Sequence, residues 1–98
     1  MGCIYMIRNI VNHKSYIGQT IQNWERRVKC HFWEANRHVH KETKLNRAIL
    51  KYGRANFVWK LIINCDKYQL DNMEIFYIKV FNSYINGYNS TTGGQGTT

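Results

Sequence analysis

The carboxylate of Glu74 falls in the middle of an otherwise apolar helical pattern. Apolar residues at positions 70, 73, 77, 78 and 81 follow the spacings of one helix face, and Glu74 lies four residues after Leu70 and four before Ile78. A carboxylate on such a face is costly unless it is paired with a cation or binds a metal ion. Three interpretations follow: a partly solvated edge of the apolar stripe, a salt bridge to a Lys or Arg, or a metal ligand.

Arg27 and His31 form a second chemically capable pair. They lie four residues apart, on a predicted helix whose apolar stripe contains Trp24, Val28 and Phe32. The Arg guanidinium presents a planar fork that matches phosphate oxygens, and His can transfer a proton near neutral pH. A solvent-exposed helix edge would explain the same pair without any function.

Tyr5 and Tyr16 fall on the two strands of a predicted hairpin, where cross-strand packing would account for both rings. A phenol has an unperturbed pKa of about 10, so a tyrosine acts as a base at neutral pH only with a cation or metal nearby. Together with Arg27, His31 and Glu74, the tyrosines complete a set of parts suited to phosphodiester cleavage. These parts are a base, a proton relay, a phosphate-binding cation and a metal ligand.

The Cys and His residues do not indicate a zinc site or a disulfide framework. The spacing of Cys30, His31, His38 and His40 matches no common zinc pattern. The three cysteines, Cys3, Cys30 and Cys65, are odd in number and form no CxxC pair. We therefore expect a reducing, intracellular setting.

The hydrophobic periodicity predicts an α+β fold. Residues 4–8 and 15–18 are predicted strands joined by a turn, and residues 24–35 a helix capped by Asn23. A second helix over residues 43–52 ends at Gly53, which suits a left-handed closing position. Residues 57–63 alternate as a strand, and residues 69–81 form a third, strongly apolar helix. The order β-β-α-α-β-α predicts a three-stranded, mainly antiparallel sheet flanked by helices.

Length and charge limit the organisation and the class of partner. The 98 residues, 44% of them hydrophobic, suffice for one packed domain, which we place at residues 1–89, with residues 90–98 as a flexible tail or the start of a linker. The chain has 14 Lys and Arg against 6 Asp and Glu, a net charge of +8. Such a charge favours a polyanionic partner, nucleic acid first and an acidic membrane surface second, although solubility alone would also explain it. No apolar run is long enough for a membrane span, and the N-terminal segment is unlike a signal peptide.

Six ordered motifs resemble those of the GIY-YIG nucleases, and the similarity extends over about residues 3–89. Within that family the sequence resembles most the catalytic domains of phage group I intron homing endonucleases. The motifs are Cys3-Ile4-Tyr5 with Tyr16-Ile17-Gly18, Arg27-xxx-His31, His40, Lys44-Leu45-Asn46-Arg47 leading to Lys51-Tyr52-Gly53, Glu74 with Phe76-Tyr77-Ile78-Lys79, and Asn86-Gly87-Tyr88-Asn89.

The resemblance implies a DNA endonuclease that hydrolyses phosphodiester bonds to 5′-phosphate and 3′-hydroxyl ends. It implies one divalent ion, Mg²⁺ or Mn²⁺, with Glu74 as its sole protein ligand. Tyr5 would be the base for the attacking water and would pass a proton toward His31. Tyr16 would hydrogen-bond water or phosphate, although the resemblance leaves open which tyrosine takes the proton.

Three further roles follow from the same resemblance. Arg27 would stabilise the developing negative charge, and His40 and Asn89 would support the site and the DNA backbone. Double-stranded DNA would be the substrate, and a C-terminal DNA-recognition region would belong to a longer chain. Two alternatives remain: a non-catalytic DNA-binding module with the same fold, and a repair or restriction nuclease of the same family.

Two departures from the family pattern bear on these assignments. Cys3 replaces the first Gly of the motif, a small change that a strand should tolerate. The loop after Gly18 is one residue longer than in the pattern, so counting from Tyr16 favours Arg26 and counting back from His31 favours Arg27. We assign Arg27, because a helix fixes the Arg–His offset more tightly than a loop fixes the other distance.

Overall fold

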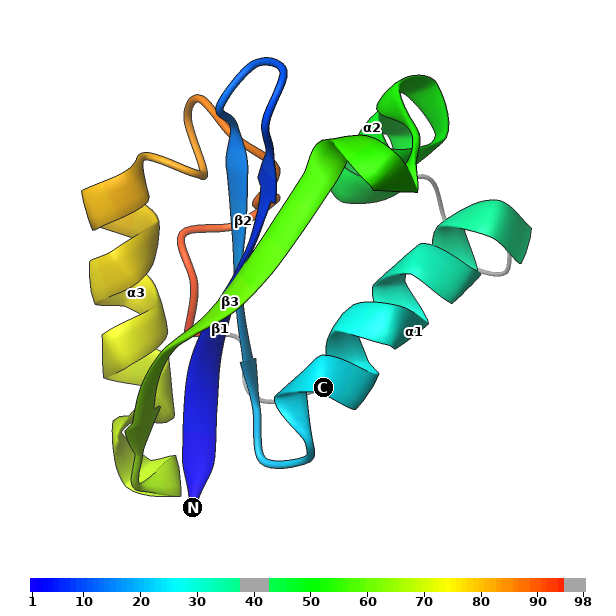
Figure 1. The fold of residues 1–98 in the computed structure, drawn as a ribbon. Coiled ribbons are helices and arrows are strands. Elements are labelled where there is room, and N and C mark those ends of the chain that lie inside the picture. The colour runs from blue at the N-terminus through cyan, green and yellow to red at the C-terminus, as the bar shows by residue number, and fades with distance from the viewer. Residues whose placement is uncertain (38–42, 95–98) are drawn as a thin grey trace.

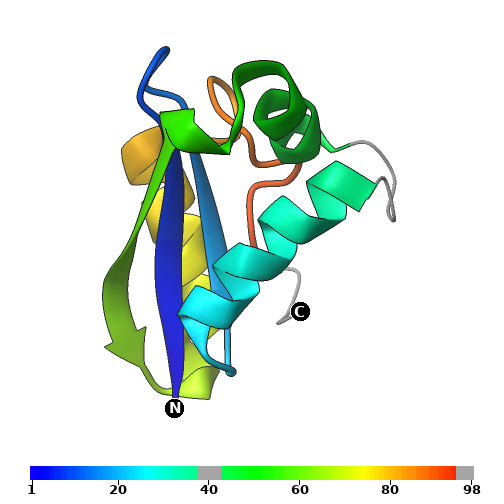
Figure 2. The same cartoon turned by 45° about the vertical axis from the view of Figure 1, so that its right-hand side comes forward.

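A computed structural model of the protein describes residues 1–37 and 43–94. A three-stranded sheet lies between two helices on one face and a third helix on the other (Figures 1 and 2). The strands are β1 (Gly2–Asn9), β2 (Ser15–Thr20) and β3 (Phe57–Cys65), and the helices are α1 (Trp24–Arg37), α2 (Lys44–Tyr52) and α3 (Leu70–Phe81). Two short 3₁₀ turns, η1 (Arg54–Asn56) and η2 (Lys67–Gln69), precede β3 and α3. The predicted α+β fold and its element order are confirmed.

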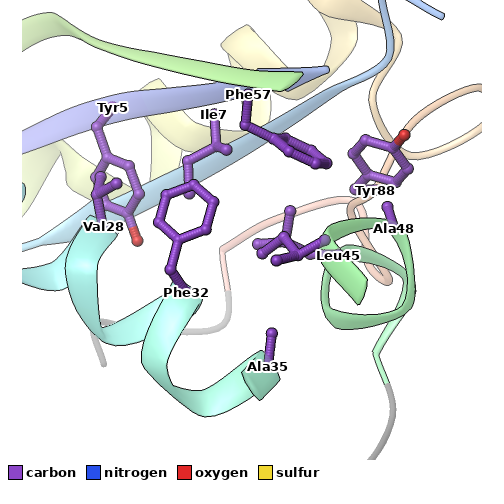
Figure 3. Packing of buried hydrophobic residues seen from close by; sticks show 10 residues of the cluster. Tyr5, Ile7, Val28, Phe32, Ala35, Leu45, Ala48, Phe57 and Tyr88 are labelled. Carbon is purple, nitrogen blue, oxygen red and sulfur yellow. The ribbon is translucent and has the colours of Figure 1, made fainter. Parts of the chain in front are cut away.

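The central strand β1 is antiparallel to both neighbours, in the spatial order β2-β1-β3. Its residues alternate between two cores, as the period of a strand requires. Tyr5 and Ile7 face α1 and α2, whereas Ile4 and Met6 face α3. Figure 3 shows the first of these cores, in which the Tyr5 and Ile7 side chains extend from the sheet toward Val28 and Phe32 of α1.

The β1–β2 hairpin sets the register that the site depends on. Its turn is held by the Asn9 backbone N–H, which donates to the Lys14 carbonyl at 2.9 Å, and by His13 in the left-handed region with φ of 64°. In the resulting register Tyr5 lies opposite Gly18. Tyr16 lies two positions before Gly18 on the same strand, so both tyrosines lie on the α1 side of the sheet.

A β-bulge interrupts the pairing of β1 with β3. Leu61 is paired with Tyr5, but Ile63 is paired with Ile4, so one residue of β3 is left over. After the bulge, the side chains that would have faced one side of the sheet face the other. The last residues of β3 pack toward α3. β3 also continues to Cys65, two residues beyond the predicted end.

The helix boundaries follow the capping residues. The Asn23 side chain accepts from the Arg26 backbone N–H at 3.0 Å, and Thr43 Oγ1 accepts from the Asn46 N–H at 3.1 Å. Gly53 has a positive φ of 83°, as expected, but its ψ of 147° lies outside the left-handed helical region. The Gly53 N–H nevertheless donates to the carbonyl of Ile49 and closes α2.

After α3 the chain returns along the outer edge of β2 (orange to red in Figure 1). The Tyr88 N–H donates to the Ser15 carbonyl at 2.9 Å. Gly87 permits this approach, because a Cβ there would lie 2.6 Å from the same carbonyl oxygen. The outer edge of β2 is therefore covered, which protects an edge strand from pairing with other chains. Over the described ranges, no helix has the length and apolar character needed to cross a membrane.

Candidate active site

The Tyr5 ring crosses from the central strand over Gly18 and reaches α1. A Cβ on Gly18 would overlap the Tyr5 ring carbon Cζ and come within 2.5 Å of the hydroxyl oxygen. Only a residue without a side chain leaves this path open. Gly18 therefore leaves the space through which the Tyr5 hydroxyl reaches His31.

Tyr5, Tyr16 and His31 form one aromatic cluster between the sheet and α1. The Tyr5 hydroxyl lies 2.9 Å from His31 Nε2 in a buried hydrogen bond. The ring centroids of Tyr16 and His31 are 5.1 Å apart, and those of the two tyrosines are 6.4 Å apart. The predicted base and relay residues are thus brought together from three different elements.

Burial keeps the two tyrosines protonated. Burial raises the pKa of Tyr5 well above its ordinary value of 10, the neighbouring Tyr16 raises it further, and the positive charge of Arg27 opposes this shift. Burial also raises the pKa of Tyr16, again opposed by Arg27. Neither phenol is therefore ionised at neutral pH in the protein without substrate.

His31 is neutral for a related reason. Burial lowers its pKa from 6.5 to about 3, and the positive charge of Arg27 adds to the decrease. A neutral imidazole that carries its proton on Nδ1 presents Nε2 as an acceptor for the Tyr5 hydroxyl. The pair can then move a proton from Tyr5 to His31.

Arg27, rather than Arg26, faces this cluster. Its guanidinium Nη1 lies 3.6 Å from Glu34 Oε1, and its side chain is 20% exposed. Its charge affects both tyrosines and His31, whereas the Arg26 side chain is exposed to solvent. The ion pair with Glu34 was not anticipated, although a Glu seven residues after an Arg lies near the same helix face.

Glu74 is held by neutral donors on the packed face of α3. It is 9% exposed, and its Oε1 accepts from Gln19 Nε2 at 3.1 Å and from the Gly94 backbone N–H at 2.9 Å. Across residues 1–37 and 43–94, no Lys or Arg forms a salt bridge with it. Within these residues the salt-bridge interpretation is therefore not supported. Burial raises the pKa of Glu74, and the two hydrogen bonds partly offset that effect.

The Glu74 carboxylate fits a hard divalent cation through its second oxygen. Oε2 accepts no hydrogen bond from the described residues. Among those residues, Gln19 Oε1 is the only side-chain oxygen or nitrogen that is both fully buried and without a partner, so Glu74 Oε2 retains some exposure to solvent. Mg²⁺ commonly uses one or two carboxylate oxygens and keeps several waters. Within the same residues, no group of three His, Cys, Asp or Glu could hold a metal ion. The negative charge of Glu74 contributes to the raised pKa of both Tyr5 and Tyr16, so the carboxylate acts electrostatically on the two phenols.

Asn89 lies next to the site but is occupied by backbone contacts. Its Oδ1 accepts from the Ile17 N–H, and its Nδ2 donates to the Ile17 carbonyl, both at 2.8 Å. Ser83 Oγ also donates to Oδ1 at 2.6 Å. The Asn89 amide therefore acts like a strand residue beside β2 and holds the segment between Tyr16 and Gly18.

The structure thus brings Tyr5, Tyr16, Arg27 and His31 together, whereas Glu74 lies on α3, which covers the other face of the sheet, and Asn89 lies beside β2. His40, the remaining predicted residue, lies outside the described residues, as does His38. Sequence reasoning missed Gln19, Asp71 and Gly94. Gln19 could have been found by its phase, because it follows Ile17 by two residues and must share the buried face of β2.

Comparison with known proteins defines the class. Residues 1–89 match the family model described as the GIY-YIG catalytic domain. The chain belongs to this family. It is similar to intron-associated endonuclease 1 of Enterobacteria phage T4, with 36% identity over 97 residues, which is 97% of this chain and 39% of that protein.

Two solved structures share the fold. One is a Glu-to-Ala mutant of the catalytic domain of intron endonuclease I-TevI, with a TM-score of 0.82, 34% identity, and coverage of 95% of this chain and 97% of that chain. The other is the catalytic domain of homing endonuclease I-TevI, with a TM-score of 0.81, 33% identity, and coverage of 93% and 99%. The chain is therefore a GIY-YIG nuclease domain related to that of an intron homing endonuclease.

Proposed function

We propose that this domain hydrolyses phosphodiester bonds of double-stranded DNA, in the presence of one divalent ion, to 5′-phosphate and 3′-hydroxyl ends. The observation that carries the proposal is the 2.9 Å contact between the Tyr5 hydroxyl and His31 Nε2, in a cluster that also includes Tyr16 and faces Arg27. A module that only bound DNA would need no such proton-transfer pair.

The raised pKa of Tyr5 decides how it can act. A free tyrosinate is too costly at neutral pH, so Tyr5 accepts a proton from the attacking water while its own proton moves to His31 Nε2. His31 is neutral and therefore ready to accept it. An anionic phosphate next to Arg27 offsets the positive charge that lowers the pKa of His31, so substrate binding favours the transfer.

Arg27 and Tyr16 act on the phosphate. The guanidinium donates hydrogen bonds to the non-bridging oxygens, on which negative charge accumulates. Tyr16 remains protonated and donates its hydroxyl hydrogen to the phosphate or to the attacking water. Asn89 contributes indirectly, because it fixes the backbone of Ile17 between Tyr16 and Gly18.

Glu74 Oε2 would hold the divalent ion, Mg²⁺ or Mn²⁺. When bound there, the ion supplies positive charge near the leaving 3′ oxygen. Glu74 would hold the ion through Oε2 alone, because its Oε1 already accepts from Gln19 and Gly94.

The chain spans about two-fifths of the phage T4 relative, so we place this activity in a longer protein. That relative's name describes an intron-associated endonuclease, which supports a homing enzyme with a separate DNA-recognition region after the catalytic domain. Such an enzyme acts inside the cell, where its DNA is.

Supercoiled plasmid incubated with and without Mg²⁺, followed by end-group analysis, tests the proposal. We expect nicked or linear products only with the metal, bearing 5′-phosphates. Tyr5→Phe should lower the rate by about 10² to 10⁴, the usual contribution of a proton-transfer group, and Tyr68→Phe, an exposed tyrosine, should not. DNA binding without cleavage at any metal concentration would favour the non-catalytic module instead.

A further inference from the structure

Gln19 is a polar residue in an apolar layer. It is 3% exposed and lies on β2 opposite Ile4 of β1, so it shares the sheet face of Ile4, Met6 and Ile17. Leu70 and Ile78 of α3 pack against this face. A buried amide is tolerated where it forms hydrogen bonds. Gln19 forms them to two carboxylates, both on α3.

The Gln19 amide nitrogen joins Asp71 and Glu74. Nε2 donates to Asp71 Oδ1 at 2.9 Å and to Glu74 Oε1 at 3.1 Å. The opposite amide orientation would place Oε1 against two carboxylate oxygens, which repel it. The NH₂ group therefore faces the carboxylates, even though Gln19 Oε1 is then left buried without a partner in the described chain.

In this orientation one buried acceptor, Gln19 Oε1, has no hydrogen bond, while Nε2 donates to Glu74 and Asp71. A purely structural contact would be better served by an apolar side chain of the same shape, because that side chain leaves no orphan atom. Gly94 adds a second donor to the same oxygen, from a backbone that approaches α3 with φ of 78°. Glu74 Oε1 is thus saturated by two donors, and only Oε2 remains for a ligand.

We infer that Gln19 is a positioning residue that fixes the Glu74 carboxylate so that Oε2 alone coordinates the divalent ion. This inference rests on the proposed function. Asp71 anchors the amide from the other side, and the Gly94 N–H prevents Oε1 from turning toward the ion. Groups that orient a ligand in this way typically change metal affinity by about 10- to 100-fold when they are removed.

The test uses the whole 98-residue chain and Gln19→Met, which keeps the side-chain length and removes both hydrogen bonds. Mn²⁺ binding, measured by the loss of the free-ion EPR signal, should weaken by about 10- to 100-fold. The metal concentration for half-maximal plasmid cleavage should rise by the same factor, while the rate at saturating metal recovers to near the wild-type rate. Gln22→Met, an exposed glutamine just beyond β2, is the matched control and should bind Mn²⁺ like the wild type.

An affinity within twofold of the wild type in folded Gln19→Met would overturn the inference. If that variant does not fold, Gln19→Asn replaces it, because the shorter amide cannot reach Glu74 and must show the same loss. Glu74→Gln separates the two proposals. If Glu74→Gln binds Mn²⁺ as well as the wild type, or if the wild type binds none, the proposed metal site is wrong. If Glu74→Gln loses Mn²⁺ binding but Gln19→Met does not, the metal site stands and only the role of Gln19 is wrong.

Discussion

Arg27 and Arg26 are adjacent residues that should respond very differently to substitution. Arg27→Ala should lower the cleavage rate by about 10² to 10³, the usual loss when a donor to developing charge is removed. Its fold should persist, because Ala favours a helix, but its melting temperature should fall, because the change removes one partner of the largely buried Arg27–Glu34 pair. Plasmid cleavage and thermal melts of both variants provide the measurement.

Arg26→Ala is the control, since the Arg26 side chain is exposed and, unlike Arg27, is not among the charges that shift the pKa of either tyrosine. Its cleavage rate should remain within a few-fold of the wild type. An inactive Arg26→Ala together with an active Arg27→Ala would show that the extra residue of the loop after Gly18 is assigned wrongly, and that Arg26 is the arginine of the family motif.

Glu74→Gln distinguishes a metal ligand from a scaffold residue. Burial raises the pKa of Glu74, so the ionised carboxylate weakens the metal-free fold above that pKa and ceases to do so as the pH falls through it. The Gln variant retains an acceptor for Gln19 and Gly94. Its metal-free melting temperature at pH 7 should therefore equal or exceed that of the wild type, with a smaller difference at pH 4, while Mg²⁺-dependent cleavage is lost.

The opposite result, a destabilised variant that still cleaves DNA, would show that Glu74 has a structural role.

The position of Glu74 on the packed face of α3 could be predicted from the sequence, because the helical period places it between Leu70 and Ile78. Its partners could not, because Gln19 and Gly94 come from distant segments, and no local pattern reports which way an amide points.

Among the elements, the β1–β2 hairpin positions Tyr5, the proposed base, through its pairing with Gly18. Gly18→Ala should destabilise the fold by about 1–3 kcal/mol, as overpacking does, because its Cβ overlaps the Tyr5 ring. Cleavage should also fall, since the hydroxyl is displaced from His31. Chemical denaturation and plasmid cleavage measure the two effects.

A second substitution tests the cause. Tyr5→Leu shortens the side chain, so the double variant with Gly18→Ala should lose less stability than the two single changes added together. Its activity should stay lost, because no hydroxyl remains. Strictly additive losses would mean that Gly18 acts through the backbone and not through the ring.

The elements are largely predictable from the sequence, because hydrophobic periods and a cap such as Asn23 are local signals. Thr43, placed inside the predicted second helix, is its N-cap. The β-bulge between β1 and β3 is not predictable, because an unpaired residue in β3 depends on tertiary register. The packing of Gly94 against α3 is also not predictable from the sequence. It depends on tertiary contacts, which the polar, glycine-rich sequence around Gly94 does not indicate.

Across the whole molecule the positive charge is unevenly distributed. Residues 26–54 carry nine of the 14 Lys and Arg against two Glu, whereas residues 66–81 carry two Lys against three acidic residues. α1 and α2 lie on the sheet face opposite α3 (Figure 2). DNA should therefore bind on the α1–α2 side, where Tyr5 and His31 also lie.

Paired charge removals measure this asymmetry. Changing Arg47 and Lys51 of α2 to Gln should weaken duplex binding and reduce the slope of log affinity against log salt by about 2, roughly 1 for each phosphate contact. The same change at Lys67 and Lys79, which are exposed on the α3 side, should leave the slope unaltered. Equal effects from both pairs would mean that the DNA has no preferred face.

The buried, neutral His31 makes the stability of the whole domain sensitive to acid. Its pKa is about 3 in the folded protein against 6.5 ordinarily. Between these values the unfolded chain binds a proton that the folded protein does not. Folding stability from this group is therefore complete above pH 6.5 and declines as the pH falls toward 3. Between pH 7 and pH 5 the decline amounts to about 2 kcal/mol, or roughly 10 °C in melting temperature for a domain of this size.

Thermal melts of the wild type and His31→Gln across pH 4–7 isolate that contribution. Gln preserves an acceptor for the Tyr5 hydroxyl but does not titrate, so its melting temperature should fall less on acidification. Glu74 has a raised pKa and shifts stability in the opposite direction, but it is present in both proteins and cancels in the comparison. His13→Asn provides the control, because Asn accepts the left-handed backbone of that exposed turn. The melting temperature of His13→Asn should follow that of the wild type across this pH range. Parallel curves for His31→Gln and the wild type would show that the pKa of His31 is the same in the folded and the unfolded chain.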